Sequence, residues 1–192
     1  MPRFIVFSEP RTGSTYLRQL LNIHFHVKCT GELLGNQYGP KDDPIGDVDR
    51  KLSALCQPVV GFKTFPEHLI YHKLSVVELV RRLDVKWVIV LWRERCLDMY
   101  VSLQIAQRTN VWFCTEPNSQ VETVKVDGTG FLQHLANMER QWKDVVRGWP
   151  PDVVPIFVKY EELAENCTLE MQRILRCMSV DPSEYELSLI HI

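Results

Sequence analysis

A strand-like segment followed by a short loop of small and hydroxyl-bearing residues is the part of the sequence best suited to chemistry. Residues 4–7 are apolar, and residues 10–15 read Pro-Arg-Thr-Gly-Ser-Thr. If a helix begins there, backbone N–H groups, the positive end of the helix dipole and the Ser14 and Thr15 hydroxyls converge on one point. Gly13 lets the backbone approach a ligand closely. The pattern predicts a phosphate-binding loop.

This loop differs from the nucleotide-triphosphate loop Gly-x-x-x-x-Gly-Lys-Ser/Thr at the positions that would hold a polyphosphate. Ser8 stands in place of the first glycine and Ser14 in place of the lysine. Only Gly13 and Thr15 match that motif, and the cation is instead Arg11. No later apolar run ends in the aspartate that would hold magnesium. We therefore expect a donor with fewer charges, held by protein cations and no metal.

A second set of candidate anion ligands follows the apolar run at residues 87–92. Arg93 comes directly after this run, and Ser102 follows in a helix-like segment. A guanidinium and a hydroxyl at a strand-to-helix turn can hold a phosphate through charge-assisted hydrogen bonds. Arg95 is an alternative to Arg93, because a small shift of the turn would exchange their roles.

These two motifs together resemble the sulfotransferases that use 3′-phosphoadenosine 5′-phosphosulfate (PAPS). In that family, the segment similar to residues 10–15 binds the 5′-phosphosulfate, and an arginine and a serine bind the 3′-phosphate. Residues 102–112 resemble the bacterial branch of trehalose and Nod-factor sulfotransferases, and residues 158–163 resemble a late family segment. The resemblance covers roughly residues 4–180. The donor site that it implies consists of Arg11, Thr12, Gly13, Ser14, Thr15, Arg93, Ser102 and Tyr160.

Sulfuryl transfer to a hydroxyl group needs a base and cations that stabilise the developing charge. Glu32 follows the first helix-like segment and is similar to a catalytic carboxylate of the family, so it is the preferred base. Arg11 and Lys63 are the candidate catalytic cations, although Lys63 could also be an ordinary lysine whose stem packs on apolar surface. His24 and His26 compete with Glu32 for the role of base.

The resemblance implies direct, metal-free transfer from PAPS to an acceptor hydroxyl. The bacterial branch favours a carbohydrate or glycolipid as the small-molecule or glycan acceptor. Tyr160 is expected to contact the adenine, and Trp112 to pack or to line the acceptor site. Two alternatives stay open: a kinase-like, nucleotide-dependent phosphotransferase and a non-catalytic nucleotide-binding protein.

Short apolar runs alternate with amphipathic segments along the chain. This alternation predicts one α/β domain with a P-loop-like parallel sheet and helices on both faces. Two stretches, 35–50 and 109–130, are rich in turn residues and are predicted to be long loops, the second with a short hairpin. The predicted strands are residues 4–7, 59–64, 87–92 and 153–158. The predicted helices are residues 17–25, 66–80, 131–146 and about 161–178.

The composition is that of an ordinary globular protein. Of the 192 residues, 45% are hydrophobic and 24% charged, which excludes disordered, collagen-like and coiled-coil chains. The net charge of −2 argues against a nucleic-acid partner. No apolar run is long enough for a membrane segment or signal peptide, so a cytoplasmic protein is expected. The six cysteines lack metal-ligand spacing and are expected to be free thiols.

The last six residues look foreign to the rest of the chain. Residues 187–192 (Leu-Ser-Leu-Ile-His-Ile) match the translation of a sequencing adapter, and no Gly- and Lys/Arg-bearing closing segment like that of many relatives follows Met178. We therefore expect a sulfotransferase-like domain over residues 1–186 that lacks its natural C-terminus, and an adapter-derived tail at 187–192.

Overall fold

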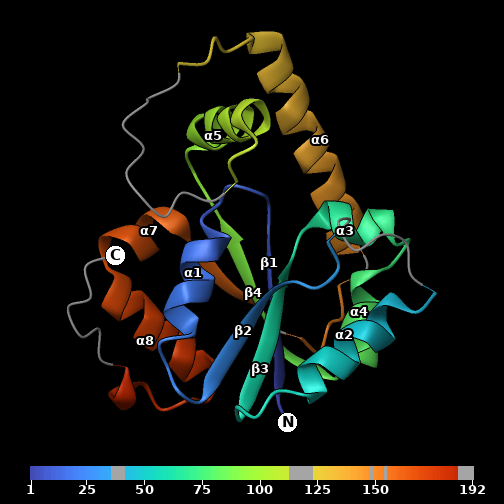
Figure 1. The fold of residues 1–192 in the computed structure, drawn as a ribbon, viewed down its shortest axis with the longest axis vertical. Helices are drawn as coiled ribbons and strands as arrows, with labels where there is room; N and C mark the ends of the chain where they lie inside the picture. The colour runs from blue at the N-terminus through green and yellow to red at the C-terminus, as the bar shows by residue number, and fades with distance from the viewer. Residues whose placement is uncertain (36–41, 113–122, 148, 154, 186–192) are drawn as a thin grey trace.

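Helices cover both faces of a parallel sheet (Figure 1). The computed structural model describes residues 1–35, 42–112, 123–147, 149–153 and 155–185. Within these residues the strand order is β2-β3-β1-β4-β5, and every neighbouring pair is parallel. The fold class expected from the sequence is confirmed. The strands are β1 (Arg3–Ser8), β2 (Val27–Glu32), β3 (Val59–Thr64), β4 (Val85–Trp92) and β5 (Pro155–Lys159).

The central strand β1 is apolar without alternation because it is buried on both faces. The side chains of Phe4 and Val6 point into one hydrophobic core, and those of Ile5 and Phe7 point into the other. Such a strand must lie in the middle of the sheet, where it directs the loop that follows it toward the centre of the molecule.

Helices α1 (Ser14–Leu21), α7 (Tyr160–Glu165) and α8 (Cys167–Cys177) cover the first face. Leu17 and Leu20 of α1 and Ile174 of α8 are fully buried in the same hydrophobic core as Phe4. The predicted extension of α1 to Phe25 is wrong: the helix ends at Leu21, and Phe25 is 60% exposed.

The opposite face is covered by α2 (Pro44–Ser53), α3 (Pro66–Tyr71), α4 (Val76–Arg82) and α6 (Gly128–Arg147). Trp142 of α6 contacts Phe7 edge to face, with ring centroids 5.0 Å apart. Helix α5 (Cys96–Thr109) follows β4 and lies beside α6 at the top of Figure 1. A 3₁₀ turn, η2 (Pro182–Glu184), follows α8.

Strand β2 was missing from the sequence prediction because it lacks an apolar run. It lies at the edge of the sheet, where only alternate side chains, those of Val27 and Cys29, are fully buried, while Lys28 and Thr30 are half-buried. That alternation is typical of an edge strand. Glu32 therefore ends a strand and does not lie in a loop after α1.

The prediction of a loop over residues 35–50 is wrong from Pro44 onward, where α2 begins. The Asp43 side chain accepts a hydrogen bond from the Gly46 N–H and caps the helix, and Pro44 suits its first turn. Because Ile45, Val48 and Leu52 recur at helical spacing, one face of α2 is buried in the core. Residues 36–41 lie outside the description.

Two predicted helices are each divided in two. Residues 66–80 form α3 and α4, separated by Lys73 with a left-handed φ of 53° and by Ser75, which caps α4. The predicted helix at 161–178 breaks at Asn166, between α7 and α8. The helix predicted at 131–146 begins earlier, at Gly128, so the predicted loop over 109–130 ends before it. Residues 113–122 are not described.

In the described residues, no helix is both long and apolar enough to cross a membrane. In that same part of the chain, no group of three or more His, Cys, Asp or Glu side chains could hold a metal ion. The five described cysteines form no disulfide, in line with the expected free thiols. Cys114 and the predicted tail at 187–192 lie outside the description.

Candidate functional site

The five parallel strands end at one edge of the sheet, where α/β proteins bind their ligands. Each strand brings a residue of the predicted site to this edge. Strand β1 leads into the loop at 9–13, β2 ends with Glu32, β3 carries Lys63 near its end, β4 precedes Arg93, and β5 precedes Tyr160. The topology therefore places these residues, far apart in sequence, along one edge.

The loop between β1 and α1 is closed by its own hydrogen bond. The Thr12 hydroxyl donates to the Glu9 carbonyl oxygen over 2.7 Å. Arg11 and Gly13 both have left-handed φ values, 66° and 89°. No side chain caps the first turn of α1, so its leading N–H groups remain available to an anion.

Gly13 is required at its position for two reasons. Its φ of 89° is a conformation that L side chains rarely adopt. A Cβ atom there would also lie 2.3 Å from Cδ2 of Tyr160, which is closer than any real contact. The loop and the residue after β5 therefore fit together only with glycine at position 13.

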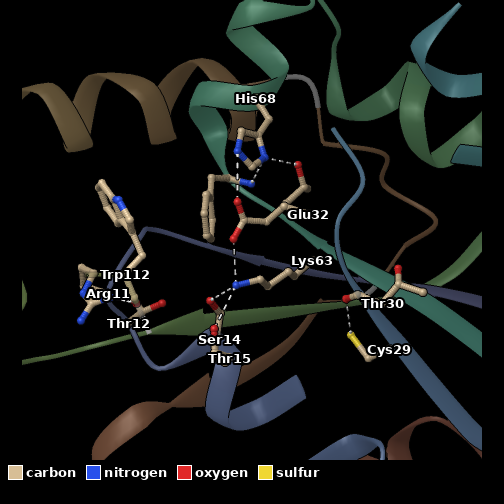
Figure 2. A network of polar contacts seen from close by, with 12 residues as sticks. Arg11, Thr12, Ser14, Thr15, Cys29, Thr30, Glu32, Lys63, His68 and Trp112 are labelled. Carbon is tan, nitrogen blue, oxygen red and sulfur yellow. Dashed lines mark hydrogen bonds and ion pairs between the residues drawn. The ribbon is translucent and has the colours of Figure 1, made fainter. Parts of the chain in front are cut away.

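Lys63, Glu32, His68 and the hydroxyls of Ser14 and Thr15 form a polar network, here called the Lys63 cluster (Figure 2). Lys63 Nζ lies 2.9 Å from Glu32 Oε1 and donates to Thr15 Oγ1 over 3.1 Å and to Ser14 Oγ over 3.5 Å. The lysine thus joins the predicted base to the start of α1.

The register of the sheet sets up this pairing. The pairing of β2 with β3 is irregular between Thr30 and Glu32, and Glu32 comes to lie beside Lys63. Lys63 is only 4% exposed, and its ammonium group lies 5.3 Å from the ring centre of Phe65. A buried lysine needs a counter-charge, and Glu32 supplies it. Lys63 is therefore no surface lysine.

His68 belongs to the Lys63 cluster and was missed by the sequence analysis. It lies in α3, is buried, and places Nε2 3.8 Å from Glu32 Oε2. Its neighbour Glu67 has Oε1 4.0 Å from the same nitrogen. Burial lowers the pKa of His68 to about 4. The available signal was its position: a histidine four residues after Thr64, in the first turn of a helix that directly follows β3.

Arg11, Arg93, Ser102 and Tyr160 form a second group, here called the Arg93 cluster. Arg11 Nε donates to Ser102 Oγ over 2.9 Å, and Arg93 Nη1 donates to the Arg11 carbonyl oxygen over 3.3 Å. The Arg93 guanidinium lies over the Tyr160 ring, 4.7 Å from its centre. Burial and then the charge of Arg93 lower the pKa of Arg11. The structure thus joins residues predicted from two separate motifs.

Positive charge in the Arg93 cluster is only partly balanced. The carboxylates of Asp98 and Glu161 lie 3.7 and 4.0 Å from Arg93, and Glu161 already accepts the backbone N–H groups of residues 94 and 95. Arg93 Nε is buried without a hydrogen-bond partner. A phosphate placed here would supply the missing acceptor and charge. Arg95, the alternative, is exposed.

The two competing histidines, His24 and His26, lie at the amino-terminal end of β2, opposite to the end where Glu32 lies. Both precede the first residue of β2, Val27, whereas Glu32 ends that strand. His24 Nε2 is 3.0 Å from the carbonyl oxygen of Asp181, and the His26 N–H donates to His24 Nδ1. This placement argues against either histidine as the base.

Trp112 reaches the site through its main chain. Its carbonyl oxygen accepts a hydrogen bond from Arg11 Nη1 over 2.7 Å, while the side chain is 41% exposed. The tryptophan main chain therefore helps to fix Arg11.

Glu9 is a second residue that the sequence analysis missed. Its carboxyl group is buried, and Oε1 has no hydrogen-bond partner. Burial, followed by the negative charge of Glu67, raises the pKa of Glu9 to about 7. The acid therefore holds a proton more readily than an ordinary glutamate, in a position only two residues before Arg11.

Among known proteins, the chain is similar only to solved structures, and no sequence comparison finds a match. No protein-family model matches the chain, and no curated protein matches it significantly. The fold is similar to that of the mouse sulfotransferase SULT7A1, solved in complex with PAP, with a TM-score of 0.54 and 16% identity. That match covers 94% of this chain and 59% of the mouse protein, so the chain spans about three fifths of that relative.

Two bacterial structures are similar over more of their own length. A sulfotransferase from Alicyclobacillus acidocaldarius matches with a TM-score of 0.60 and 13% identity, over 95% of this chain and 83% of that one. The sulfotransferase domain of the Synechococcus PCC 7002 olefin synthase matches with a TM-score of 0.54 and 16% identity, over 96% and 75%. The chain has the fold found in these sulfotransferases.

Proposed function

We propose that this chain is a sulfotransferase that moves a sulfuryl group from PAPS to an acceptor hydroxyl. The observation that carries the proposal is a carboxylate paired with a buried lysine beside an anion-binding loop. Lys63 Nζ is 2.9 Å from Glu32 Oε1 and 3.1 Å from Thr15 Oγ1. In the proposal, Glu32 is the proton acceptor and Lys63 the cation beside the transferred group. The fold of the similar structures supports the same reading.

In the proposal, the donor lies along the strand ends from β1 to β5. The free N–H groups of α1 and the Ser14 and Thr15 hydroxyls receive the 5′-phosphosulfate. Arg93 and Ser102 receive the 3′-phosphate, and Tyr160 contacts the adenine. Thr12 and Gly13 shape the loop, through the bond to Glu9 and the left-handed turn.

Arg11 lies between the two anion subsites. It belongs to the loop, and its guanidinium donates to Ser102. The same cation can therefore serve the 3′-phosphate and stabilise charge near the 5′-phosphosulfate. We propose this double role for Arg11.

The transfer is a single displacement. The acceptor oxygen forms a bond to sulfur while its proton passes to Glu32, and the bond between sulfur and the 5′-phosphate oxygen breaks. The electron pair of that bond leaves with the phosphate, which gives adenosine 3′,5′-bisphosphate and a sulfated acceptor. Lys63 and Arg11 stabilise the charge that develops on the moving and departing groups. Solvent then removes the proton from Glu32.

The acceptor class rests on the resemblance to the bacterial branch. We propose a hydroxyl of a carbohydrate or glycolipid. The exposed ring of Trp112 suits such an acceptor, because sugars present apolar faces that pack on aromatic side chains.

Calorimetry in the presence of a chelator tests the donor. We expect adenosine 3′,5′-bisphosphate to bind without metal and more tightly than Mg·ATP, and radiolabelled PAPS to label a hydroxyl compound in an acceptor screen. A preference for Mg·ATP would indicate a phosphotransferase instead. Binding of the bisphosphate with no labelled product from any acceptor class would favour a non-catalytic binding protein.

A further inference from the structure

His68 is held rigidly at the start of α3. The helix begins at Pro66, directly after Phe65, and His68 is 3% exposed. Two groups lie 3.3 Å from Nδ1 of its ring: the Phe65 backbone N–H, which donates to it, and the Thr64 hydroxyl. The imidazole therefore takes the place of a helix cap, and its orientation is fixed from the Nδ1 side.

These contacts determine which ring nitrogen carries the proton. A backbone N–H can only donate, so Nδ1 of His68 must be an acceptor and carries no proton. Burial lowers the pKa of His68 to about 4, so the ring is neutral near pH 7. A neutral imidazole with an unprotonated Nδ1 has its proton on Nε2.

That Nε2–H group points toward the predicted base. Nε2 lies 3.8 Å from Glu32 Oε2, and Figure 2 shows the ring on the side of the carboxylate opposite Lys63. That distance exceeds an ordinary hydrogen bond, so the contact between the two groups is electrostatic. The titratable groups around the ring are Glu32 from β2, Lys63 from β3, Glu67 from α3 and His72 from the end of α3.

We propose that His68 is a positioning residue whose Nε2–H group fixes the orientation of the Glu32 carboxylate for proton transfer. Lys63 holds Oε1, and the histidine restrains Oε2, so the carboxylate is held from both sides. Because a misplacement of about 1 Å can lower a rate by about 10²-fold, such a restraint has a large effect. The inference rests on the proposed role of Glu32.

Two substitutions separate positioning from helix capping. In His68→Asn, the amide oxygen can take the place of Nδ1 and accept from Phe65, but nothing reaches Glu32. In His68→Gln, the longer side chain can place an N–H near Glu32, but the cap is lost. We expect the asparagine variant to keep its melting temperature and to lose about 10- to 100-fold in kcat, with the KM for PAPS unchanged.

The glutamine variant should show the reverse. It should unfold at a lower temperature, yet below that temperature it should recover about tenfold in kcat over the asparagine variant. If kcat simply follows thermal stability in the two variants, His68 has only a structural role and the proposal is wrong.

A measurement independent of activity distinguishes this proposal from the proposed function. Nitrogen-15 NMR of labelled histidine should show His68 protonated at Nε2 and not at Nδ1, with the Nε2 signal displaced in Glu32→Gln. A proton on Nδ1 instead of Nε2, or an Nε2 signal that does not change in Glu32→Gln, overturns the proposal. If the NMR result is as expected and the wild-type protein transfers no sulfuryl group, the contact stands and the proposed function fails.

Discussion

The Lys63 cluster and the Arg93 cluster lie at the same edge of the sheet but differ in how their charges are balanced. In the first, a carboxylate lies 2.9 Å from the lysine, and hydroxyls take up its other hydrogen bonds. In the second, two guanidinium groups lie close together, and the carboxylates nearest Arg93 are 3.7 and 4.0 Å away. One region is complete without a ligand, whereas the other has surplus positive charge.

This difference in charge balance indicates different roles for the two clusters, one in turnover and the other in donor binding. A balanced buried pair gains little from an additional anion, because its cation is already neutralised. It can however hold a base in place. An unbalanced pair of arginines gains both charge compensation and hydrogen bonds when a phosphate binds. We therefore expect substitutions of Glu32 and His68 in the Lys63 cluster to affect turnover, and substitution of Arg93 in the Arg93 cluster to affect donor affinity.

Of the substitutions considered, Glu32→Gln should have the largest effect on kcat. It tests most directly whether the Lys63 cluster acts on turnover and not on donor affinity. Glutamine has nearly the same shape as glutamate but cannot take the proton from the hydroxyl that receives the sulfuryl group. We therefore expect kcat to fall by about 10²- to 10⁴-fold. The affinity for adenosine 3′,5′-bisphosphate should not weaken, because the Arg93 cluster is intact. Steady-state kinetics and calorimetry on the same preparation measure the two quantities.

Glu67→Gln is the matched control for that prediction. Glu67 lies about as far from His68 Nε2 as Glu32 does, at 4.0 and 3.8 Å respectively, but its side chain is half exposed. Its kcat should stay within about threefold of the wild type. A Glu32→Gln protein as active as Glu67→Gln would remove Glu32 from the mechanism.

Glu9→Gln should have the next largest effect, this time on stability. The pKa of Glu9 is about 7 in the folded protein, above its ordinary value of 4.5, so folding favours the protonated acid. Its stabilising contribution is fully present below pH 4.5 and is lost as the pH rises through 7. Glutamine resembles the protonated acid at every pH. The variant should therefore gain about 3 kcal/mol over the wild type between pH 5 and pH 8.

Urea unfolding at the two pH values measures this gain. His68 titrates in the opposite sense, since its pKa is lowered to about 4 and its contribution is lost as the pH falls, but it is present in both proteins. Its effect cancels in the difference. Substitution of the exposed Glu165 by glutamine provides the control. A Glu9→Gln gain that is the same at both pH values would show that the buried carboxyl is not the titrating group.

The sequence was informative about the fold wherever burial on both faces imposes a continuous apolar run. Strands β1, β3 and β4 follow such runs, and the alternation with helices predicted a parallel sheet. Strand β2 escaped prediction because an edge strand buries only alternate side chains, Val27 and Cys29. Helix α2 escaped because Asp43 and Pro44, which suggest a loop, here form a cap and a first turn.

The site was predictable where function depends on residue order, as in residues 10–15 and the pair Arg93 and Ser102. Contacts that depend on register were not predictable. Glu32 reaches Lys63 through an irregularity between β2 and β3, and His68 enters the site only because α3 begins immediately after β3. Local sequence carries neither fact, so these two contacts required the folded structure.

Arg93→Ala tests the other half of the comparison. Hydrogen bonds to charged groups contribute about 1.5–3 kcal/mol each, so the dissociation constant for adenosine 3′,5′-bisphosphate should rise by roughly 10- to 100-fold. Arg95→Ala, two residues on and exposed, should change it by less than about threefold. Calorimetry at one salt concentration compares the two. If Arg95→Ala weakens binding of the bisphosphate more than Arg93→Ala does, Arg95 and not Arg93 binds the 3′-phosphate.

Substitutions of Tyr160 should give the smallest effect and show what holds the Arg93 cluster together. The guanidinium lies 4.7 Å above the ring centre, and such contacts contribute about 0.5–1 kcal/mol at partly exposed sites. Tyr160→Leu should therefore weaken bisphosphate binding about two- to fivefold, whereas Tyr160→Phe, which keeps the ring, should change it by less than about twofold. Equal affinities for the two variants would mean that the Tyr160 ring contributes nothing to adenine binding and that the contact with the Arg11 carbonyl orients Arg93 on its own. The two clusters would then resemble each other. Arg93 would be held by the loop between β1 and α1, and Lys63 is held by the hydroxyls at the start of α1.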